Sequence, residues 1–210
     1  MGLIMNSNSK QKIVNIENQI NEELERKIDE VLISFEEQEE RKFYDSLDFL
    51  GDVKYETKLS TKTINQIIEA IKYGLNRDYK IFKPYRAIYI LIRELAPLHA
   101  KEIASIQEEI TNYLNDDIVE YEDFTSTLYF FSQAWEDLKS DWNAENKAAI
   151  IKNLIEIIED EYESDGRFDA FVADDVLRAL IIIGKDDLKA QETIKWVEKV
   201  LEEDDEDEWE

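Results

Sequence analysis

Apolar residues recur every three or four positions along most of the chain, which is the period of an amphipathic α-helix. The clearest example is the stretch from Asp174 to Leu201, where two such stripes are separated by Gly184. We expect a helical pair here, with Gly184 in the left-handed conformation that ends a helix. Asp186 or Asp187 is placed to cap the second helix. With so short a connection, the two helices should be antiparallel neighbours.

The same period predicts further helices from about residue 60 onwards. We expect them to start near residues 62, 84, 99, 123, 144, 169 and 187. Ser60 or Thr61 can cap the first, and Asn143 can cap the one near 144, while Pro97 should end or kink a helix. Upstream, residues 43–51 predict a short helix and residues 53–62 a loop that could act as a hinge. With only 5 Gly and 2 Pro, the chain has the composition of an all-α protein.

A narrower stripe predicts one long N-terminal helix over residues 10–40. Its apolar positions are Ile13, Ile16, Ile20, Leu24, Ile28, Val31 and Phe35. A narrow stripe flanked by Glu, Gln, Lys and Arg is typical of a coiled-coil seam. The seam could form a homodimer or pack on its own domain, and we favour packing on its own domain.

These patterns divide the chain into four parts. Residues 1–9 are rich in Asn and Ser and are expected to be disordered; 10–58 hold the long helix and a linker. Residues 59–201 form a helical-repeat domain, and 202–210 an acidic tail that we expect to be disordered. No uncharged run is long enough to span a membrane. The absence of Cys fits a reducing compartment, so we expect the protein to be cytoplasmic.

The predicted helices also repeat in pairs about every 40 residues. Three copies begin at Tyr85, Thr127 and Val176. The first and last share an Arg-Ala step (Arg86-Ala87 and Arg178-Ala179), an aliphatic run, a polar break and a second helix. This pattern resembles a HEAT or armadillo-type α-solenoid over roughly residues 60–201, although most of the usual HEAT Pro, Asp and Arg positions are missing. The resemblance implies stacked antiparallel helical hairpins, a HEAT-like α-α superhelix that offers an extended binding surface. An irregular helical bundle is the alternative.

Charge limits the possible partners. The chain has 25 basic and 50 acidic residues, a net charge of −25. Phosphate backbones and anionic lipids attract the opposite sign, so we expect no direct binding of nucleic acid or of a membrane surface. A negative field attracts basic proteins and cations, although it also simply keeps proteins in solution.

No catalytic centre can be assembled from the titratable residues. His99 is the only histidine, which excludes motifs that need paired histidines, and we expect it at a partly exposed helix start. Residues 161–169 have acids and Gly166 at EF-hand spacing, but Val172 stands where a bidentate Glu is required. We interpret that segment as a turn between two helices. We therefore expect no enzyme activity, no cofactor and no metal.

A weaker alternative is a carboxylate-dependent enzyme. Glu136, Asp137 and Asp141 lie beside Trp135 and Trp142, and glycosidases pair carboxylates with aromatic platforms. However, both tryptophans share a helical stripe with Leu and Phe, which favours core packing.

The best candidate for a partner site is the segment 120–141, where aromatic and acidic residues mix. The partner-binding candidates are Glu120, Tyr121, Glu122, Asp123, Tyr129, Glu136 and Asp137. Phe130 and Trp142 lie in the same segment. Carboxylates around aromatic rings suit a partner rich in Arg and Lys, through cation–π contacts and charge-assisted hydrogen bonds. If the aromatic rings face the core instead, the acids are only solvated.

The sequence thus favours a non-catalytic protein-binding module that neutralises or scaffolds a basic partner protein. A toxin or a nucleic-acid enzyme would be such a partner, and an immunity protein or an inhibitor would have this function. The alternative is a structural protein that oligomerises through the N-terminal helix.

Overall fold

The computed structural model describes residues 23–31, 33–34, 40–53, 55, 58–75, 85–115, 121–168 and 172–207. Within these ranges the protein is all-helical and contains no strand, as the composition and period predict. Residues 23–31 and 33–34 are helical. The further elements are α2 (Glu40–Asp52), α3 (Thr61–Leu75), α4 (Tyr85–Ala104), α5 (Gln107–Leu114), α6 (Tyr121–Leu138), α7 (Ala144–Asp165), the π-helix η1 (Val172–Val176), α8 (Leu177–Ile183) and α9 (Leu188–Asp207).

Each predicted helix start has a counterpart in the structure. The starts expected near 62, 84, 123, 144, 169 and 187 correspond to helices that begin at 61, 85, 121, 144, 172 and 188. The start expected near 99 coincides with a kink in α4, where His99 has non-helical angles of φ −134° and ψ 32° and separates two helical segments. Pro97 precedes it by two residues and cannot donate a helical hydrogen bond, which weakens the helix there.

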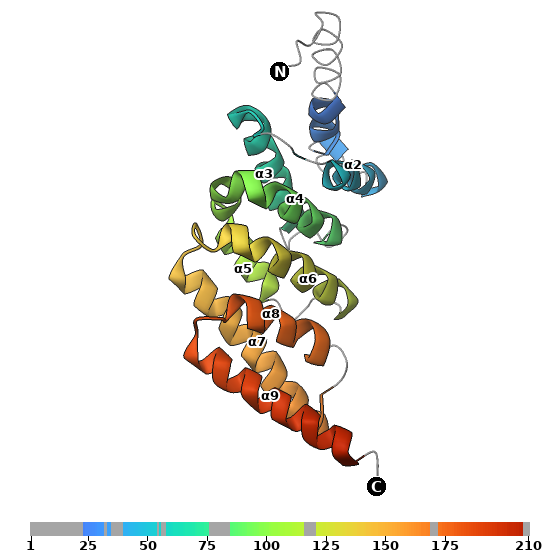
Figure 1. Ribbon diagram of the computed structural model, residues 1–210. Helices are drawn as coiled ribbons and strands as arrows, with labels where there is room; N and C mark the ends of the chain where they lie inside the picture. Colours follow the sequence, from blue (N-terminus) through green and yellow to red (C-terminus); the bar gives the residue numbers. More distant parts are fainter. Residues whose placement is uncertain are drawn as a thin grey trace, which may run out of the picture.

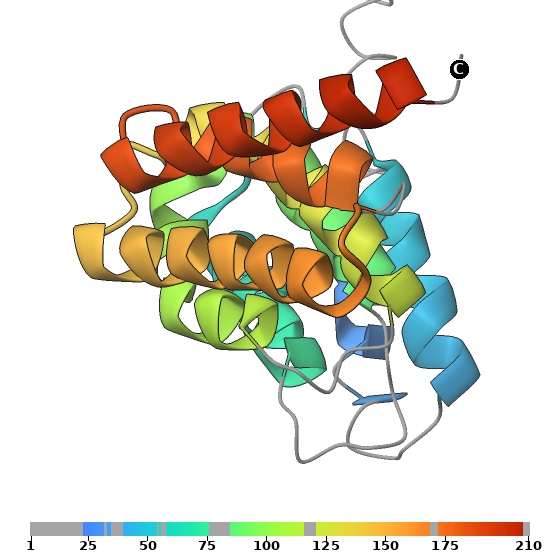
Figure 2. The same ribbon diagram turned by 90° about the horizontal axis from the view of Figure 1, so that it is seen from below.

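The helices form two series that run in chain order. α2, α4, α6 and α8 contact one another in succession, and so do α3, α5, α7 and α9. Contacts of α3 with α4, α7 with α8 and α8 with α9 join the two series. Figure 1 shows the helices following one another from the N-terminal end to α9. Seen from below, α5 and α7 lie on one side of the molecule and α2 on the other (Figure 2).

The predicted apolar stripes form the core. In α3 all five stripe residues are buried: Ile64, Ile67, Ile68, Ile71 and Leu75. Trp135 and Trp142 are 2% and 8% exposed, and their ring centroids lie 5.9 Å apart. Their predicted role in the core is therefore confirmed, and neither ring can serve as a surface platform for a sugar.

Three of the predicted helix caps are present. The Asn146 N–H donates to Asn143 Oδ1 at 2.7 Å and the Ala190 N–H to Asp187 Oδ1 at 2.9 Å. The Thr63 N–H donates to Ser60 Oγ at 3.1 Å. Each bond satisfies a backbone donor that the first turn of a helix leaves unpaired.

The left-handed conformation expected of Gly184 is wrong, since its φ is −87°. Glycine is required there for space. A Cβ at this position would lie 2.6 Å from Ala190 Cβ and 2.7 Å from the Leu180 carbonyl oxygen. The left-handed glycine is Gly166, with φ 69°, which ends α7.

The N-terminal stripe can be followed only in part. Leu24, Ile28 and Val31 are buried in the core of the chain itself. Ile13, Ile16, Ile20 and Phe35 lie outside the described residues, as does the start over 1–9. At the other end, α9 continues past the predicted end at Leu201 to Asp207. No helix of the described part combines the length and apolar character needed to cross a membrane.

Candidate protein-binding surfaces

The outer side of α6 presents three of the predicted partner-binding residues. Tyr129 is 38% exposed, and Glu136 and Asp137 are exposed two helical turns further on. Tyr121, Glu122 and Asp123 belong to the first turn of α6, but their side chains lie outside the described part, as does the whole of Glu120. The structure therefore brings together Tyr129, Glu136 and Asp137 on one face, which we call the α6 face.

The chain's own cations already occupy part of this region. The Arg93 guanidinium lies 5.0 Å from the centroid of the Phe130 ring, a cation–π contact between α4 and α6. Arg93 also forms an ion pair with Glu94 and donates from Nη1 to Gln133 Oε1 at 3.4 Å. Phe130 itself is half-buried. The Tyr129 ring packs edge-on against the Phe130 ring, with 5.3 Å between the two ring centroids.

The acids of the α6 face differ in their surroundings. Lys139 Nζ lies 2.6 Å from Glu136 Oε2, and this hydrogen bond lowers the pKa of the Glu136 carboxyl. Within the described residues no ion pair involves Asp137. Trp142, which the sequence places in the same aromatic group, is buried and cannot contact a partner. The α6 face therefore offers one exposed ring and one carboxylate that forms no ion pair with the described residues.

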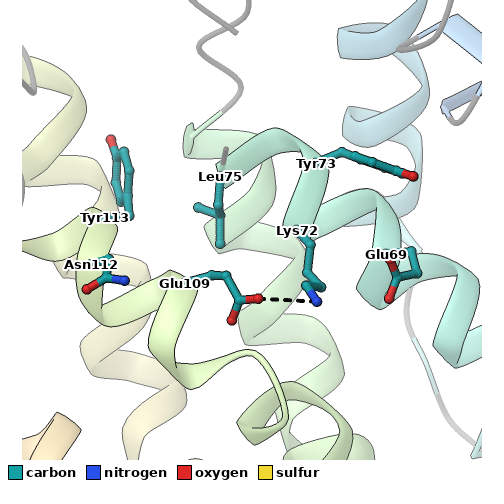
Figure 3. A pocket seen from close by; sticks show the side chains of 7 residues that line it. All are labelled: Glu69, Lys72, Tyr73, Leu75, Glu109, Asn112 and Tyr113. Atoms are coloured by element: carbon teal, nitrogen blue, oxygen red, sulfur yellow. Dashed lines mark ion pairs between the residues drawn. The ribbon is translucent and has the colours of Figure 1, made fainter. Parts of the chain in front are cut away.

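A second surface feature lies between α3 and α5. It is a pocket of about 550 Å³. It is lined by Glu69, Lys72, Tyr73, Leu75, Glu109, Asn112 and Tyr113 (Figure 3). We call it the α3–α5 pocket.

Helical spacing explains why these residues meet. Glu69, Lys72 and Tyr73 are at positions i, i+3 and i+4 of α3, and so share one side of that helix. Glu109, Asn112 and Tyr113 have the same spacing in α5. Because α3 contacts α5, the two polar edges enclose a shared space. In Figure 3 Tyr73 lies on the α3 side and Tyr113 on the α5 side, with Leu75 between them.

The pocket has an excess of negative charge. Lys72 Nζ lies 3.2 Å from Glu109 Oε1, so this pair bridges the two helices. Glu109, and to a smaller extent Glu69, raises the pKa of Lys72, which keeps the amine protonated. No ion pair of the described residues involves Glu69. The pocket is therefore suited to a cation.

The partner-binding prediction missed these residues. A signal was present, because the pattern Glu-x-x-polar-Tyr recurs at 69–73 and 109–113, 40 residues apart. That distance matches the period predicted for the helical pairs, and such a repeat would place the two segments side by side.

His99 is buried, and the expectation of partial exposure is wrong. Its side chain is 1% exposed, because the kink in α4 turns it towards the segment that precedes α3, which we call the linker. Nε2 accepts a hydrogen bond from the Leu59 N–H at 3.0 Å, and Nδ1 lies 3.8 Å from Glu102 Oε2. Burial lowers the pKa of His99, and Glu102 opposes this shift. The neutral imidazole thus connects the linker to α4.

The acids with EF-hand spacing do not form a loop. α7 continues through Asp165, so Glu161 and Glu163 lie in a helix that ends at Gly166. Acids two positions apart on a helix point to nearly opposite sides and cannot surround one ion. Nor do the described ranges contain any group of three or more acidic or histidine side chains arranged to hold a metal ion.

Comparison with known proteins adds no relative. No protein-family model, no curated protein and no solved structure matches the chain. No relative therefore supports the resemblance to HEAT repeats, and function has to be inferred from the residues and their arrangement.

Proposed function

We propose that the protein is a non-catalytic binding module for a basic protein partner, which it neutralises or scaffolds. The observation that carries this proposal is the charge of −25, which results from twice as many acidic as basic residues. Such a field accelerates the approach of a positively charged partner and disfavours nucleic acids and anionic membranes.

The described residues give a binding role more support than a catalytic one. The single histidine is buried and its Nε2 is engaged by a backbone N–H, so it is poorly placed to transfer protons to a substrate. The α6 face supplies the exposed Tyr129 ring and the exposed Asp137 carboxylate for contact with Arg or Lys. These contacts suit recognition without chemical change.

The proposed scaffold is a HEAT-like stack of helical hairpins. The succession of contacts within the α3–α5–α7–α9 series and the α2–α4–α6–α8 series supports it. In such a stack each repeat depends mainly on its neighbours. Hydrogen exchange of a Gly184→Ala variant tests this. We expect amide protection to fall most in α8 and α9, less in α6 and α7, and least in α3. An equal loss of amide protection in all of these helices would favour a single cooperative bundle.

The binding proposal is tested by salt titration. The full-length protein is used to recover partners at about 50 mM NaCl, and the affinity for each purified partner is then measured up to about 500 mM NaCl. We expect a basic partner whose affinity falls by at least about tenfold across this range. An acidic partner, or an affinity independent of salt, would contradict the proposal.

The α6 face is tested with the same partner. Asp137→Asn should weaken binding more than Glu156→Gln, which removes an equal charge from an exposed residue of α7. Equal effects of the two substitutions would mean that the α6 face is not in the interface.

A further inference from the structure

We propose that the α3–α5 pocket receives an arginine side chain of the basic partner. This inference rests on the proposed function, and it names the site and the residue type that the site selects. The pocket is separate from the α6 face, because it lies between α3 and α5, in the other series of helices.

Charge favours a cation in this pocket. The lining has two carboxylates and one ammonium group, and the ammonium group of Lys72 is held by Glu109. Glu69 remains without an ion pair in the described part of the chain. A guanidinium that entered beside Lys72 would donate hydrogen bonds to the Glu69 carboxylate, and the charge on both groups would strengthen those bonds. The negative surroundings exclude an anion of similar shape.

Shape favours arginine over lysine. Tyr73 is 40% exposed, and in Figure 3 its ring points away from α5, on the side of α3 where Glu69 lies. A planar guanidinium can stack on an aromatic face while its edge donates hydrogen bonds, whereas a compact, strongly hydrated ammonium does neither as well. The volume of about 550 Å³ also lies within the range of pockets that enclose a ligand.

The α6 face is less suited to the same ligand. There the Phe130 ring already carries Arg93, and Glu136 already binds Lys139. An incoming arginine would have to displace these groups. In the pocket, Glu69 forms no ion pair with any residue of the described part of the chain, so an arginine that binds this carboxylate displaces none of those residues.

Matched charge variants test the pocket directly. The probes are a labelled nona-arginine peptide and a nona-lysine peptide, measured by fluorescence anisotropy at low salt with the full-length protein. We expect the wild type to prefer the arginine peptide by about fivefold or more, and Glu69→Gln to weaken its binding by about tenfold. Glu192→Gln, the control, removes the same charge from an exposed position of α9 and should change binding by about twofold or less.

Two further variants separate the pocket from general charge effects. Tyr73→Ala should abolish the preference for arginine, and Tyr73→Phe, which retains the ring, should preserve it. Lys72→Ala should tighten binding more than Lys195→Ala, since Lys72 competes for Glu109 and Lys195 is an exposed residue of α9. Circular dichroism and thermal unfolding of each variant verify that it is folded.

The outcomes distinguish the two proposals. If both peptides bind the wild type but Glu69→Gln behaves like Glu192→Gln, or arginine and lysine bind alike, the pocket inference is wrong and the proposed function stands. If neither peptide binds at low salt, the proposed function fails, and the pocket inference fails with it.

Discussion

At the scale of single residues, His99 has a role that follows from its burial. It joins the linker to the kink of α4 by accepting the Leu59 N–H, across 40 residues of sequence. An imidazolium has no acceptor nitrogen, so protonation of His99 removes this bond and places a charge in the core. The charged groups that face it are Glu102, whose carboxylate favours protonation of His99, and Lys58, whose positive charge disfavours it.

Protonation of His99 should therefore destabilise the fold. Its pKa is lowered in the folded state, so the unfolded chain takes up the proton first as the pH falls below about 6.5. The contribution of His99 to the free energy of unfolding is complete above that pH and is lost between about 6.5 and the lower folded pKa. Urea unfolding of the wild type and His99→Gln at several pH values measures it. We expect the difference between the two proteins to shrink as the pH falls, and a constant difference would contradict this account.

Gly184 gives a second prediction at this scale. Gly184→Ala should lower the free energy of unfolding by about 1–3 kcal/mol, because the new methyl group overlaps Ala190 Cβ and the Leu180 carbonyl oxygen. Gly166→Ala should lower the free energy of unfolding by about 1–2 kcal/mol for a different reason, because a residue with a Cβ is strained at a φ of 69°. Steric overlap plays no part there, since no atom lies within 4 Å of the added Cβ. Urea unfolding compares them. Replacing Gly166 by Asn, which tolerates the left-handed region, should recover part of the loss, whereas Gly184→Asn should recover none.

The residues that sequence predicted well are those whose role is local. Asp187, Asn143 and Ser60 cap helices by bonding to a backbone N–H three positions ahead, and this needs only a polar side chain before an apolar stripe. The burial of His99 and the close contacts at Gly184 could not be predicted in this way. They depend on how Leu59 packs against α4 and how α8 turns into α9, and the local pattern of apolar and polar residues does not specify either.

At the scale of elements, α7 shows how a helix start is fixed. Asn143 has extended angles and its side chain accepts from the Asn146 N–H. The Asn143 N–H in turn donates to Gln107 Oε1 at the start of α5, at 2.7 Å. One residue thus begins a helix and ties it to its neighbour in the same series.

Asn143→Ala should lower the free energy of unfolding by about 1 kcal/mol, because the first turn of α7 loses its cap. The backbone bond to Gln107 is retained in this variant, so the loss measures the cap alone. Thermal or urea unfolding is the measurement, with Ser140→Ala, an exposed residue before the helix, as the control. Asn143→Asp should be close to wild type. An Asn143→Ala variant as stable as the control would show that the cap contributes nothing.

The helices could be predicted from the sequence because each carries its own periodic stripe. The π-helical turns of η1 could not, since their local pattern resembles the start of an ordinary α-helix. The kink in α4 after Pro97 could be predicted, because proline lacks the N–H that the interior of a helix requires.

At the scale of the whole molecule, the two candidate surfaces differ in how far they could be predicted from the sequence. The sequence placed Tyr129, Glu136 and Asp137 on one helix, where spacing alone determines a shared face. The α3–α5 pocket required knowing that α3 packs against α5, a contact between separate helices. The total charge could be read directly, but the pairing of Glu136 with Lys139 and of Glu109 with Lys72 could not, and these pairs decide which carboxylates remain for a partner.

The charge also has a consequence for stability. With a net charge of −25, the carboxylates repel one another in the compact state, where they lie closer together than in the unfolded chain. Added NaCl shortens the screening length from about 30 Å at 0.01 M to about 3 Å at 1 M, which weakens this repulsion. It also weakens exposed ion pairs such as Lys152–Glu156, but each of these is worth at most about 1 kcal/mol.

We therefore expect Tm to rise by about 3 to 10 °C between these salt concentrations, as repulsion spread over the molecule outweighs the exposed pairs. Scanning calorimetry measures the shift. The control is the same titration near the isoelectric point of about 4.4, where the net charge is small and the rise should largely disappear. A Tm that falls with salt at pH 7 would mean that the carboxylates are compensated within the fold. The surface would then have too little field to attract a basic partner over a distance, and the charge would cease to support the proposed function.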